Sequence, residues 1–187
     1  MINPPLELAN WKCYVFPHVG TLTPGYVAPA SGVFEKVSEG LKVYGSGYRT
    51  GALIHYIPTT AYPIANKTIY MKWKANGGGN FMGVGVWLQA DTINWSVRAE
   101  LTNLTTDHSF AGSYQITDNV WYFTRVVLSS SSYTATTSSG NYDNLGGTIV
   151  QTKTDTFGTA YRFPIFGLWD TYAGTTPYAI LGEIRIE

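Results

Sequence analysis

Five residues on two neighbouring predicted strands have side chains suited to binding a sugar: Trp87, Gln89, Asn94, Arg98 and Glu100. The face of an indole packs against the C–H groups of a sugar ring, while amides, guanidinium groups and carboxylates form hydrogen bonds with the hydroxyls. A tryptophan among such polar groups is the usual composition of a small-ligand site. The question for the fold is whether these five residues share one surface.

Alternating apolar residues place them on one face of their strands, because successive side chains of a strand point to opposite sides. In Phe81–Gln89 the expected core residues are Met82, Val84, Val86 and Leu88. In Ile93–Leu101 they are Ile93, Trp95, Val97, Ala99 and Leu101. If a hairpin through 90–92 joins the two strands, the five candidates share the outer surface. Gly83 and Gly85 then leave bare backbone beside Trp87, where a flat ligand can approach.

Two structural interpretations compete with this site. An outward Trp87 beside glycines is also explained by a loop or a second sheet that covers it, since large aromatic side chains are mostly buried. Arg98 and Glu100 stand two residues apart on one face, so they can also form a solvated ion pair that adds little stability.

Other residues are weaker candidates for a binding site or a metal site. His55 or Tyr56 faces outward from the strand Gly51–Ile57, and a lone histidine is more often structural than functional. Trp169, Asp170 and Tyr172 lie where a predicted strand gives way to a loop, and such loops commonly carry binding groups. The alternative is that Trp169 closes the core and Asp170 caps the turn. The sequence allows a structural calcium ion, for which Asp170 and Glu35 are candidate ligands by residue type alone.

Most enzymatic motifs are missing. His18, His55 and His108 lie in no recognisable nucleophile–histidine–acid pattern, which argues against serine hydrolase chemistry. The sequence has no phosphate-binding G-x-x-x-x-G-K-[ST] motif and no E-x-D-x-x-E pair of the glucanase type. We therefore predict no catalytic residues and no cofactor, and a noncatalytic role is favoured over an enzymatic one.

The composition restricts the partners. Only 13% of the 187 residues are charged, against about 25% in a typical domain, and the formal net charge is zero. Nucleic acids and anionic membranes need clustered Lys and Arg, so neither is an expected partner. The single cysteine, Cys13, excludes an intrachain disulfide and is expected to be a buried apolar residue.

Short alternating runs separated by Gly, Pro, Asn and Ser predict an all-β fold, with two packed antiparallel sheets forming a β-sandwich. We expect one domain over 1–187, in which 1–30 is an irregular or edge segment because it contains five prolines. The expected strands are Val33–Val37, Leu41–Tyr44, Gly51–Ile57, Thr68–Ala75, Phe81–Gln89, Ile93–Leu101, Ser109–Ile116, Trp121–Ser129, Ser132–Thr137, Thr148–Lys153, Phe163–Trp169 and Tyr178–Ile186.

Alternation assigns the inward and outward faces clearly in one other predicted strand, Thr68–Ala75, but not in the segment 121–127. In Thr68–Ala75 the expected inward residues are Ile69, Met71, Trp73 and Ala75. The expected outward residues are Tyr70, Lys72 and Lys74, and two lysines on one face usually serve solubility and edge protection. In 121–127 both alternating sets are partly apolar, so the faces of Trp121 and Arg125 remain open.

Several segments resemble the concanavalin A-like or laminin G-like jelly-roll superfamily, in the manner of its carbohydrate-binding modules. They are Ser38–Val43, Tyr70–Ala75, Asn119–Val126, Phe166–Asp170 and Glu183–Ile186. The resemblance implies a twisted sandwich with a concave sheet. Many members bind glycans on that sheet or at its rim, and others are glycanases or polysaccharide lyases.

One fragment, Arg98-Ala99-Glu100-Leu101, is similar to the R-x-E-L signature of alginate lyases, in which arginine and glutamate hold the uronate. The companion Q-I-H and Y-F-K-A-G-x-Y signatures of those enzymes do not occur in this sequence.

Three hypotheses follow. The first is a noncatalytic carbohydrate-binding module or lectin-like domain that binds a polysaccharide through Trp87. The second is a polysaccharide lyase or glycoside hydrolase of the same fold, and the third is a structural or adhesive domain of a viral fibre or surface protein. We expect an extracellular or cell-surface location within a larger multidomain protein, although the sequence has no signal-peptide pattern.

Overall fold

The computed structural model describes residues 3–17, 25–27, 34–44, 50–56, 66–76, 81–90, 97–102, 117–130, 132–140, 149–156, 161–171 and 178–187. These residues form thirteen strands and one short 3-10 helix, η1 (Leu8–Asn10). No helix among them is long and apolar enough to cross a membrane. The expected all-β fold with two antiparallel sheets is confirmed.

The larger sheet has seven strands. In spatial order they are β11 (Ile149–Thr156), β10 (Ser132–Ser138), β9 (Tyr122–Leu128), β6 (Thr68–Asn76), β13 (Tyr178–Ile186), β4 (Gly40–Tyr44) and β3 (Phe34–Val37). All neighbouring pairs are antiparallel.

The smaller sheet has six strands. In spatial order they are β2 (Gly25–Val27), β1 (Trp11–Pro17), β5 (Thr50–Tyr56), β12 (Tyr161–Thr171), β7 (Phe81–Ala90) and β8 (Val97–Thr102). These pairs are antiparallel as well.

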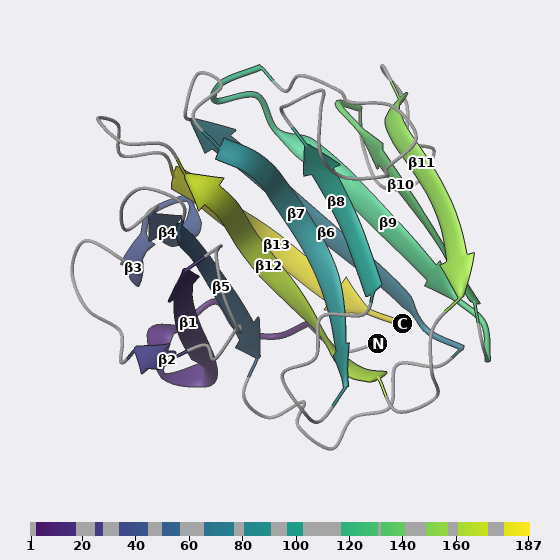
Figure 1. Ribbon diagram of the computed structural model, residues 1–187, viewed down its shortest axis with the longest axis horizontal. Helices are drawn as coiled ribbons and strands as arrows, with labels where there is room; N and C mark the ends of the chain where they lie inside the picture. Colours follow the sequence, from purple (N-terminus) through teal and green to yellow (C-terminus); the bar gives the residue numbers. More distant parts are fainter. Residues whose placement is uncertain are drawn as a thin grey trace.

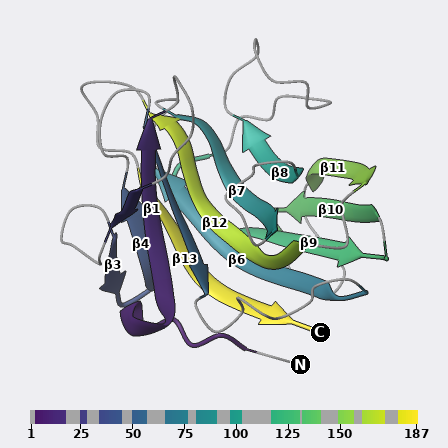
Figure 2. The same cartoon turned by 60° about the horizontal axis from the view of Figure 1, so that its bottom comes forward.

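The two sheets are stacked face to face. Figure 1 shows β7 and β12 of the smaller sheet passing over β6 and β13 of the larger one. In Figure 2 both layers are curved, and the side of β7 and β12 that is turned away from β6 and β13 is concave. Each sheet therefore has one face in the core and one outer face, and β7 and β12 of the six-stranded sheet curve so that their outer side is concave.

Alternation along β6 builds much of the core. The four residues that the sequence placed inward, Ile69, Met71, Trp73 and Ala75, are each 0% exposed, which confirms the assignment. The residues between them are half-buried on the outer face. Phe166 of β12 lies 6.3 Å from Trp73 between ring centroids, so these two side chains join the two sheets.

A small hydrogen-bonded group satisfies the polar atoms of this core. The buried indole N–H of Trp73 donates to Thr124 Oγ1 at 2.8 Å, and Thr124 Oγ1 lies 2.8 Å from Thr137 Oγ1. A buried polar group without a partner costs about 1–3 kcal/mol, so this chain of contacts removes a substantial penalty.

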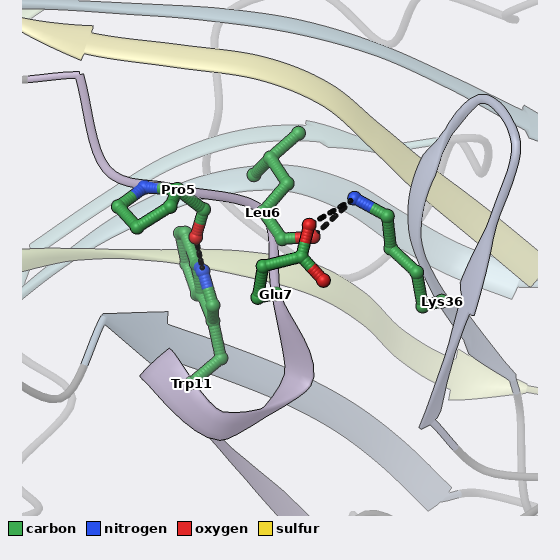
Figure 3. Close-up of polar contacts among 5 residues, drawn as sticks. All are labelled: Pro5, Leu6, Glu7, Trp11 and Lys36. Atoms are coloured by element: carbon green, nitrogen blue, oxygen red, sulfur yellow. Dashed lines mark hydrogen bonds and ion pairs between the residues drawn. The ribbon is translucent and has the colours of Figure 1, made fainter.

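The N-terminal segment closes one end of the sandwich. Trp11 is 1% exposed and its Nε1 donates to the carbonyl oxygen of Pro5 at 2.9 Å. Lys36 of β3 reaches across to the Leu6 carbonyl oxygen and lies 3.4 Å from Glu7 Oε1 (Figure 3). These contacts connect the N-terminal segment, which leads into the six-stranded sheet, to the edge strand of the seven-stranded sheet.

Most expected strands are present, with shifted ends. β1 was not expected from the sequence, and it pairs with β5 over its full length although its last residue is Pro17. The proline stands at the end of the strand, where the ladder loses little. The predicted strand Ser109–Ile116 and the segment 91–96 lie outside the described residues.

Gly40 is expected to be intolerant of substitution. Its φ is +145°, and a Cβ built there would lie 2.0 Å from the Leu181 carbonyl oxygen. We predict that Gly40→Ala lowers the free energy of unfolding by about 1–3 kcal/mol, measured by urea denaturation. Ser38→Ala, in the same exposed turn, is the control and should change it little; equal stability of the two variants would contradict the prediction.

Cys13 is expected to be unreactive in the folded protein. It is 0% exposed, and burial raises the pKa of its thiol to about 12. Because the unfolded chain releases this proton more readily, the contribution to stability is complete below about pH 9 and falls as the pH rises toward 12. A disulfide reagent at about pH 8 should label the native protein slowly and the guanidinium-unfolded chain rapidly. Rapid labelling of the native protein would show that the thiol is accessible.

Candidate functional site

The register of the six-stranded sheet identifies its inner face. Cys13 of β1 is the Cα partner of Ile54 on β5, which is in turn the partner of Phe166 on β12. All three side chains are 0% exposed, so this row belongs to the core. Positions next to it along each strand fall on the opposite, outer face of the sheet.

One row of the outer face crosses five strands. Its members, which we call the central row, are Lys12 (β1), His55 (β5), Ile165 (β12), Trp87 (β7) and Arg98 (β8). Neighbouring strands lie about 4.8 Å apart, so His55 and Trp87 are separated by about 10 Å and Trp87 and Arg98 by about half of that. Three of the residues selected from the sequence thus occupy one line across the sheet.

The next row has no side chains at its centre. Gly85 of β7 is the Cα partner of Gly167 on β12 and of Glu100 on β8. One step further, Gly83 pairs with Trp169 on one side and with Thr102 on the other. We call Gly83, Gly85 and Gly167 the glycine patch; it places three residues without side chains next to one another, between the positions of two tryptophans, and Gly167 itself is buried.

The remaining candidates separate into three groups. Gln89 pairs with Phe163, one row beyond Trp87 on the same face. Asp170 follows Trp169 on β12, and alternation puts the two on opposite faces of the sheet. Asn94 and Tyr172 lie outside the described residues.

The metal candidates do not form a cluster among the residues that the structure describes. No group of three or more His, Cys, Asp or Glu side chains there is arranged to hold an ion. Glu35 lies on β3 at the edge of the seven-stranded sheet, where its Oε1 accepts a hydrogen bond from the Tyr44 hydroxyl. Asp170 belongs to the other sheet.

The outer face of the seven-stranded sheet carries a second group of aromatic residues that the sequence did not resolve. Trp121, whose face the alternation left open, lies against Gly182 of β13: a Cβ at position 182 would be 2.7 Å from its Cη2 atom. The Nζ atoms of Lys72 and Lys74 lie 4.7 Å and 4.9 Å from its ring centroid. A glycine inside the closing strand was the available signal, since such a glycine often marks a bulge or a close approach.

Comparisons with known proteins identify the fold. No protein-family model matches the chain. No curated protein matches its sequence. Among solved structures, the alginate lyase AlgAT5 of polysaccharide lyase family 7 has a TM-score of 0.56 at 8% identity, covering 100% of this chain and 99% of that one. The chain has the concanavalin A-like jelly-roll fold.

Two other jelly-roll structures are similar in the same way. The xylan-binding module CBM15 has a TM-score of 0.50 at 14% identity and covers 99% of this chain and 94% of its own. The exoplasmic/lumenal domain of VIP36, in a form bound to Ca2+ and Man3GlcNAc, has a TM-score of 0.50 at 13% identity and covers 82% and 79%. Identities this low establish a common fold and leave the function to the residues of this chain.

Proposed function

We propose that this jelly-roll domain binds a polysaccharide on the outer face of the six-stranded sheet without converting it. The observation that carries the proposal is the glycine patch beside Trp87, with Arg98 and Glu100 aligned across from Trp87 and Gly85. In the proposed complex the indole packs on one sugar ring, and the polar residues of β8 bind its hydroxyls.

The shape and charge of the face support an extended ligand of low charge. The outer side of β7 and β12 is concave, so a chain lying along it can contact several strands at once (Figure 2). The protein has no net charge and few ionisable residues, which suits a neutral or weakly charged partner better than a polyanion such as nucleic acid.

The similar structures add support of a general kind. CBM15 is described as a xylan-binding module, and the VIP36 domain was solved with a bound oligosaccharide. A carbohydrate-binding role would suit an extracellular or cell-surface protein, which is the location we propose.

The substitution Trp87→Ala tests the site. We predict that it abolishes retention in affinity electrophoresis on the polysaccharide identified by a glycan array, an effect of at least ten-fold in the association constant, or about 1.4 kcal/mol. The melting temperature should hardly change, because in this proposal the Trp87 side chain lies on the outer face of its sheet and outside the core.

A matched control is available on the other sheet. Trp121→Ala removes an indole from the outer face of the seven-stranded sheet and should leave retention on a neutral polysaccharide unchanged. Intact retention by Trp87→Ala would contradict the assignment of the site.

Lyase activity is the second candidate, and the placement of R-A-E-L favours it. Arg98 and Glu100 occupy alternate positions of β8 and so belong to one face, in line with Trp87 and Gly85. The alginate lyase AlgAT5 also aligns with the whole chain. A uronate-binding pair on this face would serve either binding or cleavage.

Product analysis distinguishes the two candidates. After incubation with alginate and with polygalacturonate, we expect neither new reducing ends nor the absorbance of unsaturated uronates. If products form and disappear with Arg98→Ala while the fold is retained, the domain is a lyase and the noncatalytic proposal is wrong.

A further inference from the structure

The outer face of the seven-stranded sheet combines lysines with half-buried aromatic rings. Across β4, β13 and β6, the residues Lys42, Ile180 and Lys74 are Cα partners in one row. Ile180 is only 3% exposed although its partners place it on the outer face. A position on this outer face is therefore not by itself exposed, since neighbouring groups cover Ile180.

Trp121 forms the centre of this surface. Its indole lies against the backbone at Gly182, where a Cβ would be 2.8 Å from Cζ3 as well as 2.7 Å from Cη2. Lys72 and Lys74 place their ammonium groups near the same ring, and Lys72 also lies 5.9 Å from the Phe123 centroid. The ring attracts both cations, and it holds them in defined positions on the sheet.

A second lysine–aromatic group lies on the other side of β13. Lys42 Nζ is 4.0 Å from the centroid of Tyr178 and 4.5 Å from that of Tyr44. The two rings are fixed in turn, because the Tyr178 hydroxyl donates to Asn119 Oδ1 at 3.0 Å and the Tyr44 hydroxyl donates to Glu35. The position of the Lys42 ammonium group is thus set by rings that are themselves anchored.

Two of these three lysines have no acidic partner within the described part of the chain. Lys74 pairs with Glu39, whereas no carboxylate there lies within 4.0 Å of Lys42 Nζ or Lys72 Nζ. Glu183 is the Cα partner of Lys72 but forms no ion pair with it. The ammonium groups of Lys42 and Lys72 are therefore free to pair with an external anion.

Basic residues outnumber acidic ones over the same outer face. The basic residues are Lys42, Lys72, Lys74, Arg125 and Arg185. The acidic residues near them are Glu35, Glu39, Glu183 and Glu187, and Glu187 Oε1 lies 3.5 Å from Arg185 Nε. Lys74 and Arg185 are paired with Glu39 and Glu187, so the groups of this face that complement an anionic ligand are the ammonium groups of Lys42 and Lys72.

From these contacts we infer a second saccharide site, separate from the six-stranded sheet, that binds a polysaccharide bearing carboxylate or sulfate groups. Trp121 contacts a sugar ring, and Lys42 and Lys72 pair with anionic groups of the chain. These lysines lie on strands separated by β13, about 10 Å across the sheet. A polymer with a charge on every residue can reach both positions, and an indole beside the two cations offers an apolar surface on which a sugar ring can pack.

The test uses polygalacturonate at low salt and the Trp87→Ala protein, so that the indole of the six-stranded face does not contribute. Any binding through Arg98 and Glu100 is then the same in all the variants that are compared. We expect residual binding that weakens as salt is added. Lys42→Gln and Lys72→Gln should each lower the association constant about two- to five-fold, and the double variant about ten-fold. The matched control is Lys67→Gln, which removes one positive charge elsewhere and should have no such effect.

Two outcomes would overturn this inference. One is equal binding by the Trp87→Ala parent and the double lysine variant, with both folded by their melting temperatures. The other is binding of polyglutamate as tightly as polygalacturonate with no loss in Trp121→Ala, which would indicate a peptide-binding surface. Neither result bears on retention through Trp87, so this site and the proposed function can fail independently.

Discussion

The buried indole of Trp73 is the constraint on which much of this structure depends. Its ring lies 5.1 Å from Tyr122 in its own sheet and 6.3 Å from Phe166 in the other, while its N–H is satisfied by Thr124. A slip of one residue between β6 and β9 would break that hydrogen bond and turn Lys72 and Lys74 into the core. Both packing and polar satisfaction therefore select one register, and this register determines which residues reach the outer faces.

The sequence predicted best where both faces of a strand differ clearly in polarity. Along β6 the contrast between Ile69, Met71, Trp73 and the intervening lysines is strong enough to assign every side chain correctly. Along β13 it is not sufficient, because the register shifts between Leu181 and Glu183 and the alternation is interrupted at Gly182. A bulge of this kind depends on what packs beside it, here Trp121, and such a partner is not visible from local spacing.

In the candidate site, too, features set by neighbouring segments of the sequence could be predicted, and contacts between segments far apart in the sequence could not. That Trp87 of β7 and Arg98 of β8 share one face follows from alternation in adjacent segments of the chain, whereas their register does not, because a hairpin through 90–92 would have placed residue 95 opposite Trp87. The neighbour on the other side is β12, more than seventy residues away in the sequence, and it brings Gly167 next to Gly85. No spacing rule predicts that contact, since strand order in a sandwich is decided by the packing of the whole core.

The order of the strands also has a consequence for how the domain is made. β12 and β13 come last in the chain, yet β12 lies between β5 and β7 and β13 lies between β4 and β6. Neither sheet can close during synthesis until these two segments have left the ribosome, and until then both sheets have open, hydrogen-bonding edges in their interiors. Folding should accordingly be a late and cooperative event with high contact order. A shortened chain that ends before β12 would consist of two incomplete half-sheets and would be prone to aggregation.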